Sequence, residues 1–270
     1  MTLPYINDNG LVLLGCGKMG SAMLQGWLAK GIKHSSVTIL DPYPSDWVKM
    51  QGVAINTGLP CNPAVCILAV KPQMMGKALP QLQALGNGET LFISIAAGTS
   101  IASLEAALGA DTPIIRAMPN TPAAVGRGIT ALIGNMHSTK IHMDTAEILL
   151  AAVGQTVRLD NEGQMDAVTA VSGSGPAYVF HLIETMAAAG VAQGLPPALA
   201  MKLAKTTVAG AGELAEKSDE SPAQLRVNVT SPAGTTAAAL EVLMDAEIGL
   251  PKVVGDAIKA AADRSRELGE

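Results

Sequence analysis

Residues 15–20 read G-C-G-K-M-G, which places three glycines at the spacing G-x-G-x-x-G. The run follows a short apolar segment, Leu11–Leu14, and precedes a segment with helical spacing of apolar residues, Ser21–Lys30. In such a strand, turn and helix, the glycines allow a tight turn, close approach of a pyrophosphate and close helix packing, with helix N–H groups facing the anion. A tight turn without a ligand is the alternative. The candidate ligands are Gly15, Cys16, Gly17, Lys18, Met19 and Gly20.

An acidic side chain, Asp41, follows the predicted strand Val37–Leu40, about 20 residues beyond the glycines. A carboxylate at this place accepts hydrogen bonds from the adenine ribose hydroxyls of a dinucleotide and disfavours a 2′-phosphate, which favours NADH. The neighbouring Ser45 could still accommodate a phosphate, so NADPH and NADH both remain candidates. The competing interpretation is that Asp41 only caps the turn before Pro42.

Three further loops end predicted strands and carry small or polar residues. Because ligands of open α/β sheets bind at the carboxyl edge of the strands, we expect all three loops to lie at the cofactor. Lys71 can reach anionic groups, the alanines leave room for the nicotinamide end, and Asn120 offers an amide. The candidate residues are Ala69, Val70, Lys71, Pro72, Ala96, Ala97 and Asn120.

The elements that must position these loops alternate between strand and helix, which predicts an α/β fold with a Rossmann-type, doubly wound and mostly parallel sheet. The predicted strands are Leu11–Leu14, Val37–Leu40, Val65–Val70, Leu91–Ile95, Ile114–Ala117, Gly128–Ile133 and Thr156–Leu159. The predicted helices between them are Ser21–Lys30, Asp46–Gln51, Gln73–Leu85, Ser100–Leu108 and Asp144–Val153. We place the domain boundary near residue 160, with a dinucleotide-binding domain over residues 1–160.

Residues 161–270 are expected to form an all-helical domain. The predicted helices are Met165–Ser172, Pro176–Ala192, Pro197–Glu216, Pro222–Asn228, Thr235–Ala246 and Pro251–Leu268. Small residues between positions 187 and 194 permit close helix packing. A helical domain this rich in apolar residues buries its surface poorly alone, so we expect an obligate homodimer formed through it.

Composition argues against several classes of partner. The formal net charge is −5 and Lys and Arg do not occur in runs, so the sequence predicts no basic patch that could bind a nucleic-acid backbone. The sequence shows neither an apolar run that could span a membrane nor a secretory signal, so we expect a cytoplasmic protein with no membrane partner. The three cysteines are expected to be reduced thiols without a metal site, and the four histidines to be structural.

Six motifs, in chain order, resemble those of the pyrroline-5-carboxylate reductase family. They are G-C-G-K-M-G, A-V-K-P (69–72), I-A-A-G (95–98), M-P-N-T-P-A (118–123), S-G-S-G-P-A-Y (172–178) and V-T-S-P-A-G-T-T (229–236). The last motif is the most specific, whereas the glycine run is shared with many dehydrogenases. The resemblance implies a Rossmann domain, an all-helical dimerisation domain, often a ring of dimers, and reduction of 1-pyrroline-5-carboxylate to L-proline with NADPH or NADH.

The resemblance also implies individual site residues. It adds Asn56 and Asn228 to the candidate cofactor contacts. It places the substrate at Ser231, Gly234, Thr235 and Thr236. A helix start after S-P-A-G makes independent sense as an anion site, although from the residues alone a capped helix is the simpler interpretation. Two residues depart from the family pattern: Ala233 stands where glycine is common, and Val227 where a charged residue is frequent.

Hydride transfer to a C=N carbon is easiest when the nitrogen is protonated, so alignment is the main task of the protein. We therefore interpret Thr236 as the catalytic group, its hydroxyl bonded to the ring nitrogen while residues 231–236 hold the carboxylate. Two alternatives remain. A β-hydroxyacid dehydrogenase would need a proton-accepting Lys in the first helices after the boundary, and none occurs between Tyr178 and Lys202. A regulator that binds the nucleotide without turnover would not need residues 231–236.

Overall fold

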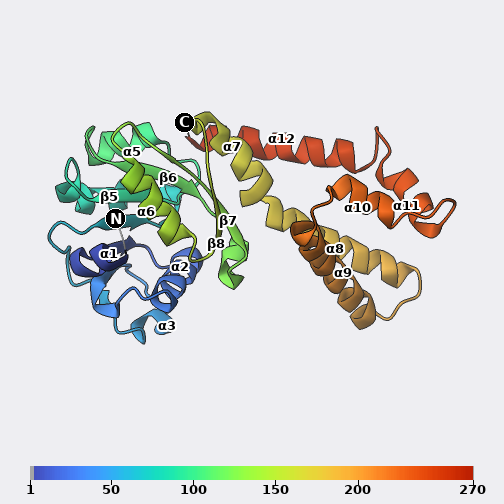
Figure 1. The fold of residues 1–270 in the computed structure, drawn as a ribbon, viewed down its shortest axis with the longest axis horizontal. Coiled ribbons are helices and arrows are strands. Elements are labelled where there is room, and N and C mark those ends of the chain that lie inside the picture. The colour runs from blue at the N-terminus through green and yellow to red at the C-terminus, as the bar shows by residue number, and fades with distance from the viewer. Residues whose placement is uncertain (1–2, 270) are drawn as a thin grey trace. The chain divides into compact units, whose positions relative to one another are not determined.

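The computed structural model describes residues 3–269 and separates into two compact units. Unit 1 runs to Gly173 and also includes the chain from Ala262 onward, and unit 2 is Ser174–Ala261. Unit 1 holds the sheet, whereas unit 2 is built from helices (Figure 1). This confirms the predicted fold class, a Rossmann-type α/β part followed by a helical part.

The sheet of the described residues has eight strands in the order β3-β2-β1-β4-β5-β6-β7-β8. The strands are β1 Leu11–Leu14, β2 Val37–Leu40, β3 Ala54–Ile55, β4 Val65–Leu68, β5 Leu91–Ser94, β6 Ile114–Met118, β7 Gly128–Gly134 and β8 Gly154–Arg158. Strands β6 and β7 pair antiparallel, and the other neighbouring strands pair in parallel. The strand order reverses between β1 and β4, which is the switch point where open α/β sheets bind ligands.

Helices cover both faces of this sheet (Figure 1). The α-helices with residues in unit 1 are α1 Leu3–Asn9, α2 Lys18–Ala29, α3 Asp46–Lys49, α4 Met75–Ala78, α5 Ile101–Leu108, α6 Lys140–Leu150, α7 Met165–Val168 and the end of α12 Leu250–Gly269. Along β1, Leu11 and Leu13 join a core with α1, α2, α3 and α6, whereas Val12 and Leu14 join a second core with α4 and α5. Burial on both faces explains why these strands are continuous apolar runs.

Some elements differ from the sequence prediction. The expected helix Gln73–Leu85 is instead the 3₁₀ turn Pro72–Met74, the single turn α4 and the 3₁₀ segment Leu79–Leu85. Pro80 explains this break, because proline has no N–H for the helical ladder. The expected helix Met165–Ser172 is α7 followed by a π-helical segment, Thr169–Gly173.

The first helical turns after residue 160 belong with the sheet. Met165 and Ala170 are buried, and a Cβ added at Gly173 would lie 2.5 Å from the Cε atom of Met118 in β6. Unit 1 therefore extends to Gly173, beyond the boundary near residue 160 that the sequence predicts.

Unit 2 is organised around two long helices that lie side by side (Figure 1). Its α-helices are α8 Gly175–Ala192, α9 Pro197–Lys217, α10 Pro222–Asn228, α11 Thr235–Leu243 and the first part of α12. A Cβ added at Gly190 of α8 would lie 3.3 Å from the Cβ of Ala200 in α9. The small residues thus permit the close packing that the sequence predicts.

Candidate active site

The glycine turn follows β1 and opens α2. Gly15 has a φ of +86°, and a Cβ there would lie 2.8 Å from Val70 Cγ1. A Cβ at Gly20 would lie 2.6 Å from the carbonyl oxygen of Gly15, whereas a Cβ at Gly17 would meet nothing within 4 Å. The first and third glycines therefore serve the turn and the helix packing, and the second faces open space. This is the geometry that leaves room for a pyrophosphate above the start of α2.

Asp41 connects the end of β2 to the glycine turn. Its Oδ2 accepts a hydrogen bond from the Cys16 N–H over 2.6 Å, and its Oδ1 accepts one from the Tyr43 N–H over 2.7 Å. The side chain of Asn56 holds the Asp41 backbone, accepting from its N–H over 3.0 Å and donating to its carbonyl over 2.7 Å. Asp41 therefore stabilises its own turn, and its carboxylate is also held against the glycine turn.

Cys16 itself points into the protein. Its side chain is buried, and its Sγ lies 3.6 Å from the Ser21 hydroxyl. Burial raises the pKa of the Cys16 thiol, the hydrogen bond with Ser21 lowers it, and the Asp41 carboxylate raises it further. Cys16 does not line the cavity described below, and its N–H is already bonded to Asp41, so its predicted role as a cofactor contact stays a prediction.

A cavity of about 640 Å³ opens at the switch point. It is lined by seven of the predicted cofactor residues: Gly15, Gly17, Asp41, Asn56, Ala69, Val70 and Lys71. Of the other predicted residues in this region, Lys18, Met19 and Gly20 form the first turn of α2, and Pro72 starts the following 3₁₀ turn. The residues present therefore fit a dinucleotide, with a glycine turn at one wall and a carboxylate and an amide at another.

The same cavity includes residues that sequence reasoning missed. They are Leu14, Leu40, Pro42, Tyr43, Met74, Lys77, Ala78 and Gln81. Met74, Lys77, Ala78 and Gln81 follow the spacing i, i+3, i+4, i+7 of one helical face. That spacing, directly after the A-V-K-P loop, is the signal that would have identified them.

The loops after β5 and β6 are held by local contacts. Ala96 is buried and Ala97 partly buried, in the turn between β5 and α5. Asn120 is buried, and its Oδ1 accepts a hydrogen bond from the Ile129 N–H over 2.9 Å. This bond gives Asn120 a structural task in the turn between β6 and β7. Neither loop lines the switch-point cavity, so the predicted cofactor contacts of Ala96, Ala97 and Asn120 stay predictions.

In unit 2, the candidate substrate residues lie where α11 begins. Gly234 is the N-cap of α11 and its N–H donates to the Ser231 carbonyl over 3.0 Å, while Thr235 and Thr236 are the first two helical residues. Ala233 has a φ of +56°, the left-handed conformation that favours glycine. The four residues are thus brought together at a helix N-terminus, where N–H groups point away from the helix.

Asn228 ends α10 and has partners within unit 2. Its Nδ2 donates to Glu220 Oε2 over 2.9 Å, and its Oδ1 accepts from Gln224 Nε2 over 2.8 Å. Its role as a cofactor contact, like the substrate roles of Ser231, Gly234, Thr235 and Thr236, stays a prediction.

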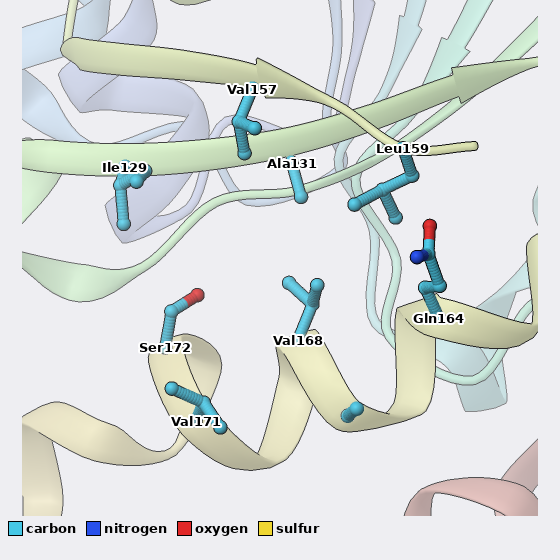
Figure 2. A pocket seen from close by; sticks show the side chains of 9 residues that line it. Ile129, Ala131, Val157, Leu159, Gln164, Val168, Val171 and Ser172 are labelled. Atoms are coloured by element: carbon cyan, nitrogen blue, oxygen red, sulfur yellow. The ribbon is translucent and has the colours of Figure 1, made fainter. Parts of the chain in front are cut away.

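A second cavity in unit 1, of about 400 Å³, is almost entirely apolar. Figure 2 shows Ile129 and Val157 pointing from the strands toward Val168 and Ser172 on the helical segment below. None of its lining residues is a predicted site residue, and it offers no acid or base for chemistry. Val157 and Val171 are 43% and 61% exposed, so this apolar surface is open.

Comparison with known proteins matches both parts of the chain. Residues 162–268 match the family model for pyrroline-5-carboxylate reductase dimerisation, and residues 11–98 match that for NADP oxidoreductase, coenzyme F420-dependent. The pyrroline-5-carboxylate reductase of Pseudomonas aeruginosa is 40% identical, over 96% of this chain and 97% of its own length. The chain belongs to the pyrroline-5-carboxylate reductase family.

Solved structures of this family share the whole fold. A pyrroline-5-carboxylate reductase from Coxiella burnetii superposes with a TM-score of 0.88 at 33% identity, covering 97% of this chain and 99% of its own. Plasmodium falciparum pyrroline carboxylate reductase, solved with NADP bound, gives a TM-score of 0.85 at 30% identity, covering 98% and 99%. The pyrroline-5-carboxylate reductase fold therefore accounts for both units of this chain.

The structure was also searched for metal-binding clusters and for membrane-spanning helices. Among residues 3–269, no group of three or more His, Cys, Asp or Glu side chains is placed to hold a metal ion. In the same described range, no helix combines the length and the apolar character needed to cross a lipid bilayer.

Proposed function

We propose that this protein reduces 1-pyrroline-5-carboxylate to L-proline, the last step of proline biosynthesis, using NADPH or NADH. The observation that carries the proposal is the 40% identity to a pyrroline-5-carboxylate reductase over nearly the full length of both chains. The glycine turn and the Asp41 carboxylate, which line the switch-point cavity, support the proposal because they fit the binding of a nicotinamide dinucleotide. The enzyme is thus an oxidoreductase that acts on an imine.

The residues of this chain are proposed to bind and align the reactants. The turn from Gly15 to Gly20 and the start of α2 would hold the pyrophosphate, with Asp41 and Asn56 beside the adenine ribose. The loops at Ala69–Pro72 and Ala96–Ala97, together with Asn120 and Asn228, would hold the rest of the nucleotide. A reduced nicotinamide, when bound, supplies the hydride.

On the substrate side, the start of α11 is proposed to hold the carboxylate. Ser231, Gly234 and Thr235 would present backbone N–H groups and hydroxyls to this anion. The Thr236 hydroxyl would hydrogen-bond the ring nitrogen, which fixes the imine carbon for attack. The rate enhancement would then come from alignment rather than from a strong acid.

The two rival functions are disfavoured by particular features. A β-hydroxyacid dehydrogenase needs a proton acceptor for the hydroxyl, and α8 contains no lysine. A regulator without turnover does not explain a family match that includes the predicted substrate residues at 231–236.

Initial rates would separate these functions. Purified protein is mixed with 1-pyrroline-5-carboxylate or 1-pyrroline-2-carboxylate and with NADH or NADPH, and the absorbance of the reduced nicotinamide is followed. We expect turnover with 1-pyrroline-5-carboxylate and slower turnover with the isomer. Oxidation of 3-hydroxy acids with no imine reduction would support the dehydrogenase, and tight cofactor binding with no turnover of any substrate would support the regulator.

We also propose that two copies pair through the helical part, in the cytoplasm, and that such dimers assemble into a ring. Many large apolar side chains of unit 2 are exposed in a single chain, among them Phe180 at 58% and Leu203 at 48%. Burial of such surface stabilises obligate dimers. Light scattering should give a mass of at least twice 27.5 kDa, and a larger multiple if a ring forms. A monomeric mass at micromolar concentration would refute the dimer.

A further inference from the structure

Arg116 is a buried cation in the middle of the sheet. It lies on β6, between Ser94 of β5 and Ile133 of β7, and its side chain is 8% exposed. A buried guanidinium must be paired, because the desolvation of an isolated charge is costly. Its Nη1 donates to Glu162 Oε1 over 2.7 Å.

The same carboxylate oxygen also accepts a backbone hydrogen bond. The N–H of Ile101, the first residue of α5, donates to Glu162 Oε1 over 2.9 Å. Glu162 therefore links a central strand to the N-terminus of α5, where a carboxylate also interacts favourably with the helix dipole. This fixes the start of α5 and with it the end of the loop that leads from β5.

That loop, residues 95–100, is held from a second direction. Gly98 has a φ of +72°, and a Cβ added there would lie 3.1 Å from the Cβ of Leu268 in α12. Close to the same end of α12, the Ser265 hydroxyl donates to Asp166 Oδ1 over 2.6 Å. Two parts of unit 1 thus hold the 95–100 loop in place. One is the segment that carries Glu162, and the other is the last turns of α12.

We infer that Glu162 is a positioning residue for hydride transfer, because it holds the 95–100 loop through its shared contact with Arg116 and Ile101. This inference rests on the proposed function, which places the nicotinamide end of the cofactor beside Ala96 and Ala97. A loop that shifts by a fraction of an ångström would misalign the nicotinamide while leaving the imine carboxylate bound at α11. The pair then contributes to kcat more than to substrate binding.

The test compares Glu162→Gln with the double variant Arg116→Met/Glu162→Met. The glutamine leaves Arg116 without a countercharge, so both stability and alignment are expected to suffer. The double variant removes both charges, which is often neutral for stability, but it also removes the acceptor for the Ile101 N–H. If Glu162 positions the loop, the double variant regains thermal stability and does not regain kcat.

Three readouts are collected for each variant. In the cofactor-free protein, hydrogen exchange of peptides covering residues 95–101 should be faster than in the wild type. The kcat should fall roughly 10- to 100-fold, with the KM for 1-pyrroline-5-carboxylate changed less than about twofold. The deuterium isotope effect with 4-deuterated reduced cofactor should rise, because hydride transfer becomes more rate-limiting. Glu147→Gln, which breaks the exposed pair with Arg158, is the matched control and should change none of the three.

Recovery of kcat together with stability in the double variant would overturn the inference, since the pair would then be purely structural. Unchanged loop exchange would also overturn it, and so would failure of both variants to fold. The outcome is separable from the proposed function. If the wild type does not reduce the imine, the proposed function fails, while loop exchange and titration of reduced cofactor still report on the loop.

Discussion

The backbone N–H of Cys16 donates to the carboxylate of Asp41 over 2.6 Å, so the glycine turn and the end of β2 are joined through one side chain. This contact holds a negative charge in the cavity where the adenine ribose is proposed to bind. Asp41→Asn should therefore raise the ratio of kcat/KM for NADPH over NADH by about tenfold, because the repulsion of a 2′-phosphate is removed. Initial rates with both cofactors measure this ratio.

The control for Asp41 is Asp46→Asn, which removes an exposed carboxylate paired with Lys49 on α3. It should leave the cofactor ratio unchanged. An unchanged ratio in Asp41→Asn as well would mean that the carboxylate serves only to cap its turn.

Ala233 adopts a left-handed conformation in the turn before α11. An alanine there is strained whereas glycine is not, and this residue is exposed, so no packing is lost on substitution. Ala233→Gly should raise the free energy of unfolding by about 0.5–1 kcal/mol in urea titrations at fixed protein concentration. Ala238→Gly, inside α11, should lower it by a similar amount. A loss of stability in Ala233→Gly would show that the turn is not strained.

Thr236 is the second residue of α11 and the proposed partner of the imine nitrogen. Thr236→Val keeps the shape of the side chain and removes the hydroxyl, so kcat/KM should fall about 10²-fold. Thr236→Ser restores a hydroxyl and should recover most of the activity. Steady-state kinetics measure both, and full activity in the valine variant would exclude the assigned role.

Arg158 bridges two carboxylates in unit 1, with its Nη2 2.6 Å from Asp144 Oδ1 and its Nε 2.7 Å from Glu147 Oε1. Hydrogen bonds from Lys140 and Arg158 lower the pKa of Asp144 below its ordinary value of 3.8, and the bond from Arg158 lowers the pKa of Glu147 below 4.5. The stabilisation is therefore present above about pH 4.5 and lost as the pH falls through the lowered values.

Arg158→Gln should thus be less stable than the wild type at neutral pH, by a small amount because the network is exposed, and the two proteins should converge in acid. Urea unfolding at a series of pH values measures the difference. A gap that does not change with pH would mean that the network contributes nothing through these ionisations.

The cofactor-binding part of the site could be predicted because its backbone geometry requires particular residue types at particular positions. Gly15 and Gly20 occupy places where a Cβ would collide, and Asp41 follows a buried strand, so spacing alone identified them. The helix Leu3–Asn9 and the strand Ala54–Ile55 were not predicted. The helix buries only Ile6, and the strand has two residues, so neither leaves a periodic pattern.

Long-range pairing lies beyond what spacing can reveal. Arg116 and Glu162 are 46 positions apart in the chain, yet the fold brings Nη1 of Arg116 to 2.7 Å from Oε1 of Glu162. The same limit applies to the substrate side, where the sequence identified residues 231–236 as a helix start and the family resemblance supplied their role.

The central claim is that an amino-acid carboxylate binds at the N-terminus of α11 while a dinucleotide occupies the glycine turn. A crystal structure of the protein with L-proline and oxidised cofactor tests it most directly. We predict the proline carboxylate within hydrogen-bonding distance of the N–H groups of Gly234 to Thr236 and the pyrophosphate over Gly17. Proline bound elsewhere, with the start of α11 free of ligand, would contradict the account.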